Sequence, residues 1–498
     1  MATAVIPSAW TFPARRLSPS TRMAIVLLVA TLVLRAPRFG DPNLHVDEIF
    51  YLQVGDLMWN GALPFVDVWD RKPIGLFLLF GAIRLLGGDG IVQYQLVASG
   101  FAFGTAIVVA QLARRMGVSN LAAGAAGFIY LTGLAALGGY GGQSPVFYNL
   151  FVAGAALLTL RALDAPDRGG LTSAGVLAMA LCGIAIQIKY TAVFEGCFFG
   201  ALLAWRAWRA FGLAAAVRAA ALFALCGIGP TGAAAAYYAA VGELQAFWFA
   251  NFVSIGLRPP ATPDQVHVRL TRIGLTLLPL LVCTVVAFAA VRWEGLRGGK
   301  LGTYHLVLGW LAVALGGFFL LGTYYWHYAL PLLVPLSLAA APFFERSLIG
   351  PASVLLVAFW NAVLIGYPDE RPSTSRQQIA ELTSAVSQNL NGRCLFMFDG
   401  PPAVDYLSGA CHLTPYVFPY HLSLAVEETG LGVDPLTELR RILLARPGVI
   451  VSSSVPVMDP NRSARAFLYA VLARDYRLVG SYPAKRRHYQ VYALRPKR

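Results

Sequence analysis

The chain has 498 residues, of which 57% are hydrophobic and only 13% are charged, and its formal net charge at pH 7 is +14. Its mean hydropathy of +0.61 is well above that of a soluble domain, and apolar runs near the length of a bilayer span recur along it. These values exclude a soluble globular protein, and we attribute the basic charge to arginine-rich cytoplasmic loops rather than to a nucleic-acid partner.

Eleven apolar segments are predicted to cross the membrane as helices. They lie near residues 22–36, 91–113, 119–138, 145–162, 172–188, 190–208, 213–241, 266–291, 302–322, 327–344 and 347–366. The apolar segment 73–87 contains Arg84 and is shorter than the roughly 20 residues that a crossing helix needs, so we expect it to lie along the surface. With a cytoplasmic N-terminus, most basic loops then fall on the cytoplasmic side, as the positive-inside tendency requires.

This topology places several polar segments together on the outer face. They are the first external loop, 37–90; a second external loop, 242–265, which begins with an interfacial amphipathic helix; the turn at Lys189; the Tyr-Tyr-Trp-His sequence at 324–327; and everything after Tyr367. We expect these segments to converge at the outer end of a transmembrane domain formed by residues 1–367.

From Pro368 the composition changes and predicts a small external α/β domain over residues 368–498. After a linker rich in Pro, Ser and Thr, residues 393–399 and 449–453 are typical of strands, 435–445 and 463–474 of amphipathic helices, and 476–494 of a hairpin that turns at 483–486. Cys394 and Cys411 lie here; they pair if the domain faces an oxidising compartment and stay free otherwise.

The first external loop carries the densest charge in the chain. Residues 45–73 contain five carboxylates and a basic pair, namely Asp47, Glu48, Asp56, Asp67, Asp70, Arg71 and Lys72. Charge this dense beside a membrane is energetically expensive and indicates a functional site.

Several of these charged residues, and Lys189, also have a structural explanation. Asp47 could cap the helix that follows it, and Glu48 could complement the dipole of that helix. Asp67 and Asp70 either orient the basic pair or bind an acceptor. Lys189 could be a snorkelling residue at a helix end.

Asp47-Glu48 followed by Tyr51, Gly61, Pro64, Asp67 and Lys72-Pro73 resembles the signature of the superfamily C glycosyltransferases that use dolichyl- or polyprenyl-phosphate sugars. The resemblance is greatest to the protein O-mannosyltransferases and the lipid A aminoarabinose transferases. Residues 183–189 are similar to the Gly…Thr-Lys turn of that family, and 327–335 to its Arg-Tyr…Pro span. Two positions depart from the pattern: Gln187-Ile188 precedes Lys189, and His327 stands where an Arg is common.

The resemblance implies an inverting transfer of a sugar from a polyprenyl-phosphate donor to an acceptor hydroxyl on the outer face. Such a reaction needs a carboxylate to take the hydroxyl proton and cations to neutralise the departing phosphate. The family motif assigns the base to Asp47, beside Glu48. The donor phosphate is expected to contact Lys72 first, then Arg71, Lys189 and Arg258. The residues expected to bind substrate are Tyr51, Asp67, Asp70 and His327.

No cofactor or metal is predicted, because the Asp-Glu pair has no further ligand at metal spacing nearby. The expected partners are a polyprenyl-phosphate-linked sugar, membrane lipid, and an unknown glycan, lipid or protein acceptor, with no nucleic acid. We expect a bacterial inner-membrane protein whose site and C-terminal domain face the periplasm.

Two other functional classes stay open. A transporter or lipid flippase tends to show an internal repeat and charges at mid-membrane. A non-catalytic membrane scaffold has no need of Asp47 beside Lys72.

Overall fold

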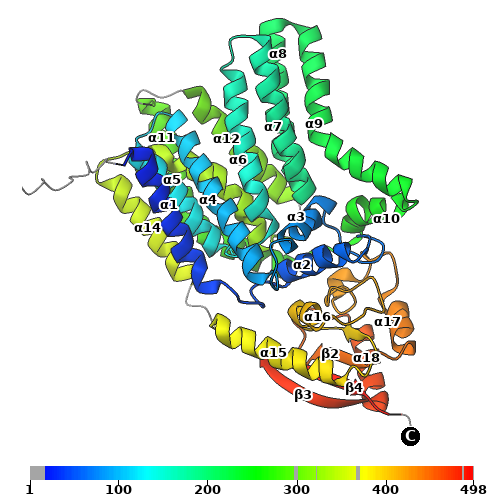
Figure 1. The fold of residues 1–498 in the computed structure, drawn as a ribbon. Helices are drawn as coiled ribbons and strands as arrows, with labels where there is room; N and C mark the ends of the chain where they lie inside the picture. The colour runs from blue at the N-terminus through cyan, green and yellow to red at the C-terminus, as the bar shows by residue number, and fades with distance from the viewer. Residues whose placement is uncertain (1–16, 297–300, 321, 366–370, 485–486, 497–498) are drawn as a thin grey trace, which may run out of the picture.

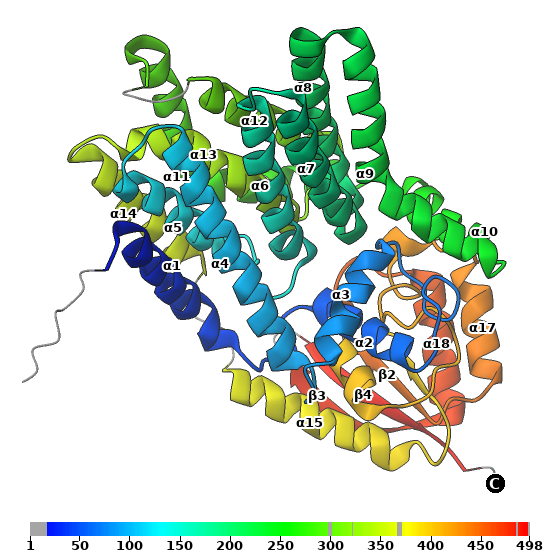
Figure 2. The same cartoon turned by 45° about the horizontal axis from the view of Figure 1, so that its top comes forward.

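A computed structural model describes residues 17–296, 301–320, 322–365, 371–484 and 487–496. A bundle of helices forms the larger part of the molecule, and a small α/β unit lies at one end of it (Figures 1 and 2). The surface helices α2 (Val46–Trp59) and α3 (Ile74–Arg84) lie between the bundle and this unit. The predicted fold class is confirmed: a polytopic helical membrane protein with a small C-terminal sheet.

Eight helices within the described residues are long and apolar enough to cross a membrane. They are α1 (Pro19–Arg35) with the turn that follows it, α4 (Ile91–Arg115), α6 (Ser144–Leu163), α7 (Arg168–Ile188), α9 (Leu213–Ala240), α11 (Pro263–Glu294), α12 (Leu301–Leu320), and the 3-10 segment Trp326–Leu332 with α13 (Leu333–Phe344). Each coincides with a predicted span, and the chain is an integral membrane protein.

The other three predicted spans coincide with α5 (Asn120–Ala136), α8 (Val193–Phe211) and α14 (Ile349–Ile365). Helices α5 and α14 have 17 residues each, and α8 carries Glu195, Arg206 and Arg209 within its 19 residues. All three pack against spans of the bundle. Helix α3 has only 11 residues, too few to cross, as expected for segment 73–87.

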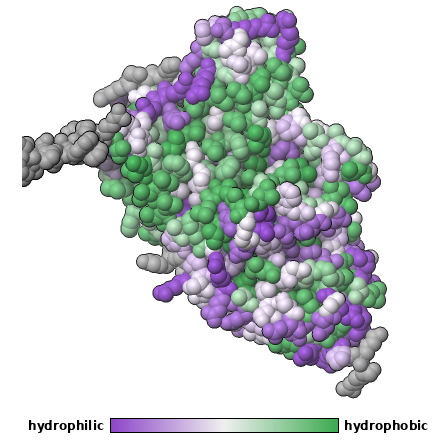
Figure 3. All heavy atoms as spheres, viewed as in Figure 1, coloured by the Kyte–Doolittle hydropathy of each residue, from purple (hydrophilic) through white to green (hydrophobic). Residues whose placement is uncertain are grey.

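Apolar side chains cover the flank of the bundle, between hydrophilic ends (Figure 3). Val33 on α1, Val285 on α11 and Phe359 on α14 are among the large exposed ones. A surface of this kind is stable when lipid tails surround it, and it leaves the backbone hydrogen bonds inside the helices.

The α/β unit contains a four-stranded sheet in the order β1-β2-β4-β3. Strand β1 (Leu395–Met397) pairs in parallel with β2 (Val449–Ser453), whereas β4 (Arg487–Leu494) runs antiparallel to β2 and to β3 (Tyr476–Ala484). Helices α15 (Pro372–Asn389), α16 (Pro402–Ser408), α17 (Pro435–Leu444) and α18 (Arg462–Asp475) pack around it. The strands, the hairpin, α17 and α18 occur where the sequence predicts them.

Helix α15 replaces part of the predicted linker. It begins at Pro372, because a proline is tolerated in the first helical turn, where its missing N–H has no intrahelical partner. Ile379, Leu382 and Val386 then recur at helical spacing and are buried. The predicted domain boundary at 367/368 and the turn residues 485–486 lie outside the described residues.

The first external loop is built into the α/β unit. Trp69 is 4% exposed, and its ring lies 5.5 Å from that of Tyr416 and 4.8 Å from that of His421. Its backbone N–H donates to the Pro415 carbonyl at 2.9 Å. The apolar core of the α/β unit therefore includes a residue from the other end of the sequence.

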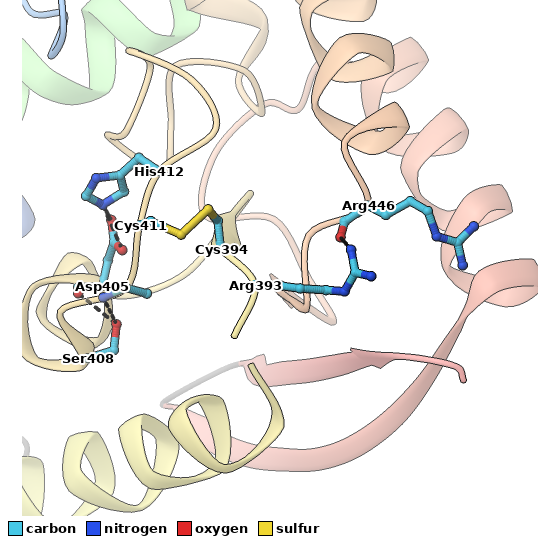
Figure 4. Close-up of a disulfide and its surroundings, with 8 residues drawn as sticks. Arg393, Cys394, Asp405, Ser408, Cys411, His412 and Arg446 are labelled. Carbon is cyan, nitrogen blue, oxygen red and sulfur yellow. Dashed lines mark hydrogen bonds and ion pairs between the residues drawn. A yellow bond between two sulfur atoms is a disulfide. The ribbon is translucent and has the colours of Figure 1, made fainter. Parts of the chain in front are cut away.

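A disulfide between Cys394 and Cys411 ties β1 to the segment that follows α16 (Figure 4). Next to it, His412 Nε2 lies 3.1 Å from Asp405 Oδ2, which also accepts a 2.9 Å hydrogen bond from Gln53 of α2. The disulfide thus fixes the start of a long loop, residues 412–434, where that loop meets the surface helices.

Replacing Cys411 by Ser should destabilise the α/β unit by about 3 kcal/mol, since the bridge closes a loop across a separation of 17 residues. The melting temperature of the purified chain should fall, and reductant should lower that of the wild type in the same way. Cys197→Ser, at an exposed free cysteine of α8, is the matched control. Equal melting of Cys411→Ser and the wild type would contradict the expectation.

Candidate active site

A cavity of about 840 Å³ opens where the bundle, the surface helices and the α/β unit meet. Its wall combines the first external loop, the turn at Lys189, the segment around Arg258, residues 322–328 and parts of the α/β unit. The external segments that the sequence expects to converge are therefore neighbours in the fold.

Eight of the ten predicted site residues line this cavity, and two do not. Those on its wall are Asp47, Tyr51, Asp70, Arg71, Lys72, Lys189, Arg258 and His327. Glu48 and Asp67 lie elsewhere.

Asp47 sits in the first turn of α2 with its carboxylate on the cavity wall and its side chain 26% exposed. The N-cap is His45, whose Nδ1 accepts the Asp47 N–H at 3.3 Å and lies 3.8 Å from Asp47 Oδ2. Because His45 caps the helix, the Asp47 carboxylate is not the capping group. Sequence reasoning missed His45, although it directly precedes the helix that the motif begins.

Glu48 points the other way, into the protein, and is 0% exposed. Its carboxylate packs so close to Gly141 that a Cβ there would lie 2.1 Å from Oε2. Burial raises the pKa of Glu48, while His45 and Arg35 oppose that rise. Arg35 donates to the carbonyls of Gly139 and Gly141 at 2.6 and 2.7 Å, and Glu48 packs against Gly141. The two buried side chains therefore contact the same loop after α5, Arg35 from α1 and Glu48 from α2.

Asp67 is exposed and shapes its own turn. Its Oδ2 accepts the Leu63 N–H at 2.7 Å. This contact fixes the loop that leads to Asp70, outside the cavity.

Two lysines on the cavity wall differ in their protonation. Burial lowers the pKa of Lys72, but Tyr51, Asp70 and Asp47 outweigh it, so that the pKa lies above its ordinary value. Burial and then Lys72 lower the pKa of Lys189 to about 7, with Asp47 opposing. Lys72 is therefore a permanent cation, and Lys189 titrates near neutral pH.

Aromatic side chains surround these cations. The Lys72 ammonium lies 5.6 Å from the centre of the Tyr51 ring, and that of Lys189 lies 4.2 Å from the centre of the Tyr328 ring. His327 packs edge-on to Tyr328 at 4.9 Å and to His45 at 5.7 Å. The faces of such rings attract cations and hold the ammonium groups in position.

Arg71 and Arg258 are joined by Glu427, which sequence reasoning missed. Arg71 Nη2 lies 2.6 Å from one oxygen of Glu427, and Arg258 Nη2 lies 2.8 Å from the other. Arg71 also donates to Ser254 Oγ at 2.6 Å and to the Gly430 carbonyl at 3.1 Å. A single carboxylate from loop 412–434 thus fixes two guanidinium groups of the membrane part, which no local sequence pattern reveals.

Glu427→Gln should release loop 412–434, because it leaves two partly buried guanidinium groups facing each other without a charge partner. Breaking such a pair costs about 3 kcal/mol. Limited proteolysis should cut this loop faster in the variant than in the wild type. Glu428→Gln, at the exposed neighbouring position, should be cut at the wild-type rate. Equal rates for both variants would argue against the clamp.

Among the described residues, no group of three or more His, Cys, Asp or Glu side chains is arranged to hold a metal ion.

No protein-family model matches this sequence, and no curated protein matches it either. Solved structures do match. ArnT from Cupriavidus metallidurans bound to undecaprenyl phosphate has a TM-score of 0.63 at 14% identity, covering 95% of this chain and 97% of that one. Its apo state gives 0.64 at the same identity, with coverage of 96% and 100%.

The chain has the fold of these ArnT structures. The apo oligosaccharyltransferase of Archaeoglobus fulgidus matches this fold more distantly, with a TM-score of 0.51 at 10% identity over 87% of this chain and 69% of that one. The match to ArnT extends over nearly the whole length of both chains, so it includes the α/β unit as well as the bundle. The shared fold agrees with the resemblance seen in the first-loop motif.

Proposed function

We propose that this protein transfers a sugar from a polyprenyl-phosphate donor to an acceptor hydroxyl on the outer face of the membrane, with inversion at the anomeric carbon. The observation that carries the proposal is the presence of the Asp47 carboxylate and the Lys72 ammonium on the wall of one cavity, within a superfamily C fold. The undecaprenyl phosphate held by ArnT supports a polyprenyl-phosphate ligand.

In the proposed step, the acceptor oxygen attacks the anomeric carbon from the face opposite the phosphate. Asp47 takes the hydroxyl proton as the new glycosidic bond forms. The bond to the phosphate oxygen breaks, and the phosphate leaves with the electron pair. Lys72 and the protonated form of Lys189 neutralise the charge that develops on it.

Inversion follows from a single displacement. A retaining reaction by way of a covalent intermediate needs a second carboxylate close to the first. Glu48, the neighbour of Asp47 in sequence, is turned away from the cavity. The other carboxylates on the wall are engaged: Asp70 accepts the Arg71 N–H, and Glu427 pairs with Arg71 and Arg258.

Two observations support the outer face of a bacterial inner membrane. The Cys394–Cys411 disulfide persists in oxidising compartments such as the periplasm. The C-terminal end of α4, whose last turn holds Arg114 and Arg115, points away from the α/β unit (Figure 1), which suits the cytoplasmic side.

The decisive experiment compares envelope glycolipids and glycans by mass spectrometry in strains that lack the gene. One glycan should lose a single sugar in the deletion strain and regain it with the wild-type gene, but not with Asp47→Asn. Identical glycans in all strains, with the protein present, would refute the transfer function.

The proposal predicts that the affinity for a polyprenyl phosphate depends on pH because of Lys189. Since its pKa is about 7, the ammonium is present below pH 7 and is lost as the pH rises through that value. The wild type should bind a polyprenyl phosphate about tenfold more tightly than Lys189→Met at pH 6, and about equally at pH 8.5. Binding measurements in nanodiscs give the dissociation constants of the wild type and of Lys189→Met. Protonation of the ligand affects both constants equally, so it cancels in their ratio. A ratio that does not change with pH would exclude Lys189 from the phosphate site.

A further inference from the structure

One part of the cavity wall belongs to the α/β unit and has no part in the proposed chemistry. Tyr420, Tyr482, Arg487 and Tyr489 line it there. Arg487 is the first residue of β4, and its side chain is only 14% exposed. A cation in this position faces the same space as Asp47 and Lys72.

The guanidinium of Arg487 is held in a fixed orientation. Its Nη1 donates to Asp399 Oδ1 at 3.1 Å, and its Nη2 donates to the hydroxyl of Tyr489 at 3.1 Å and to that of Tyr420 at 3.5 Å. A guanidinium has five N–H donors, so these contacts leave capacity for a further acceptor. The group is pre-organised to bind a planar or tetrahedral anion.

Among the residues that the structure describes, the charge around Arg487 is not balanced. Asp399 is 1% exposed and is shared: Arg465 Nη1 lies 3.7 Å from its second oxygen, which also accepts a hydrogen bond from Ser453. Two guanidinium groups and one carboxylate carry a net charge of +1. A partly buried positive charge in excess is stabilised when an anion enters from the cavity.

We infer that Arg487, Tyr420 and Tyr489 form the acceptor subsite, and that the acceptor is a saccharide bearing a phosphate or carboxylate group. The inference rests on the proposed transfer function. Arg487 pairs with the anionic group, while the tyrosine rings and hydroxyls contact the apolar face and the hydroxyls of the sugar. A cavity of about 840 Å³ is large enough for a donor headgroup and a saccharide together.

The test is a binding measurement on the full chain in nanodiscs, with a polyprenyl phosphate added to occupy the donor site. Glucuronate, glucose 6-phosphate and glucose are titrated by ligand-observed NMR. The wild type should bind both acidic sugars at least tenfold more tightly than glucose, and Arg487→Gln should lose that preference. Arg477→Gln, at an exposed arginine of β3, should bind like the wild type. An undiminished preference in Arg487→Gln, or equal binding of glucose, would overturn the subsite.

Arg487→Lys is a second test variant that we expect to fold, because it keeps the positive charge beside Asp399. It loses the planar guanidinium group. It should melt like the wild type and bind the acidic sugars about threefold or more weakly. Wild-type affinity in this variant would count against the subsite, even where Arg487→Gln fails to fold.

A further arm separates a membrane-borne acceptor from a soluble one. Glucuronosyl diacylglycerol in the nanodisc is compared with free glucuronate. Tighter binding of the lipid supports a glycolipid acceptor, and equal binding supports a soluble glycan. Failure of both to bind would refute the subsite.

The binding test of the subsite and the glycan test of the transfer function can fail independently of each other. If the wild type binds acidic sugars through Arg487 but no strain shows a glycan change, the transfer function fails and the anion site stands. If transfer is established but Arg487→Gln binds acidic sugars normally, only the subsite fails.

Discussion

Asp47→Asn is expected to lower the rate of sugar transfer by about 10²–10⁴-fold, the usual contribution of a positioned general base. The amide has the shape of the carboxylate but cannot take a proton from the acceptor hydroxyl. Because Asp47 lies in the first helical turn on the cavity wall, and His45 already caps the helix, the substitution leaves the fold of α2 intact. The melting temperature and the affinity for a polyprenyl phosphate should stay close to those of the wild type.

The matched control is Asp56→Asn on the same helix. Asp56 pairs with Arg84 of α3 at 2.8 Å, outside the cavity, and a partly exposed pair of this kind is worth about 1 kcal/mol. This variant should transfer sugar at nearly the wild-type rate. Equal losses in the two variants would mean that Asp47 acts through the fold of α2, and wild-type transfer in Asp47→Asn would remove it as the base.

Lys72→Gln is expected to reduce transfer by about 10²–10³-fold, comparable to the loss of one preorganised donor at a developing charge. Lys72 directly precedes Pro73, the N-cap of α3, and Tyr51, Asp70 and Asp47 keep its ammonium protonated by holding its pKa above the ordinary value. Charge develops on the phosphate oxygen as the sugar departs, so the loss should be larger in kcat than in the affinity for donor.

Lys72→Arg provides the rescue. It restores the positive charge with a different shape, so transfer should return in part. Single-turnover measurements separate chemistry from donor binding. A loss in Lys72→Gln that lies wholly in KM would assign Lys72 to ground-state binding, and an unchanged rate would exclude it from the phosphate site.

Hydropathy and charge bias predicted the membrane part of the fold well, because a lipid environment admits few arrangements of backbone. Arg84 marked α3 as a surface helix, and every predicted span coincides with a helix. Helix α15 was missed because Pro372, read as part of a linker, is the first residue of that helix.

The residues predicted for the cavity wall come from the first-loop motif and from three other positions, Lys189, Arg258 and His327. The first-loop motif assigned the base to Asp47, but it also placed Glu48 in the site. Adjacent residues on a helix point in directions about 100° apart, and the pattern does not show that Glu48 faces the protein interior. Glu427 and Arg487 lie hundreds of residues from that motif. Only the folded chain brings Glu427 close to Arg71 and Arg487 to the cavity. Neither residue belongs to a local sequence pattern.

The burial of Trp69 among residues of the α/β unit bears on how the protein is made. The spans are synthesised in order, and the indole lacks its aromatic partners until Tyr416 and His421 have been synthesised. The first loop therefore matures last, although it is among the first segments to emerge. A nascent chain halted before the final hundred residues therefore lacks the aromatic partners of Trp69 and the part of the cavity wall that contains Arg487.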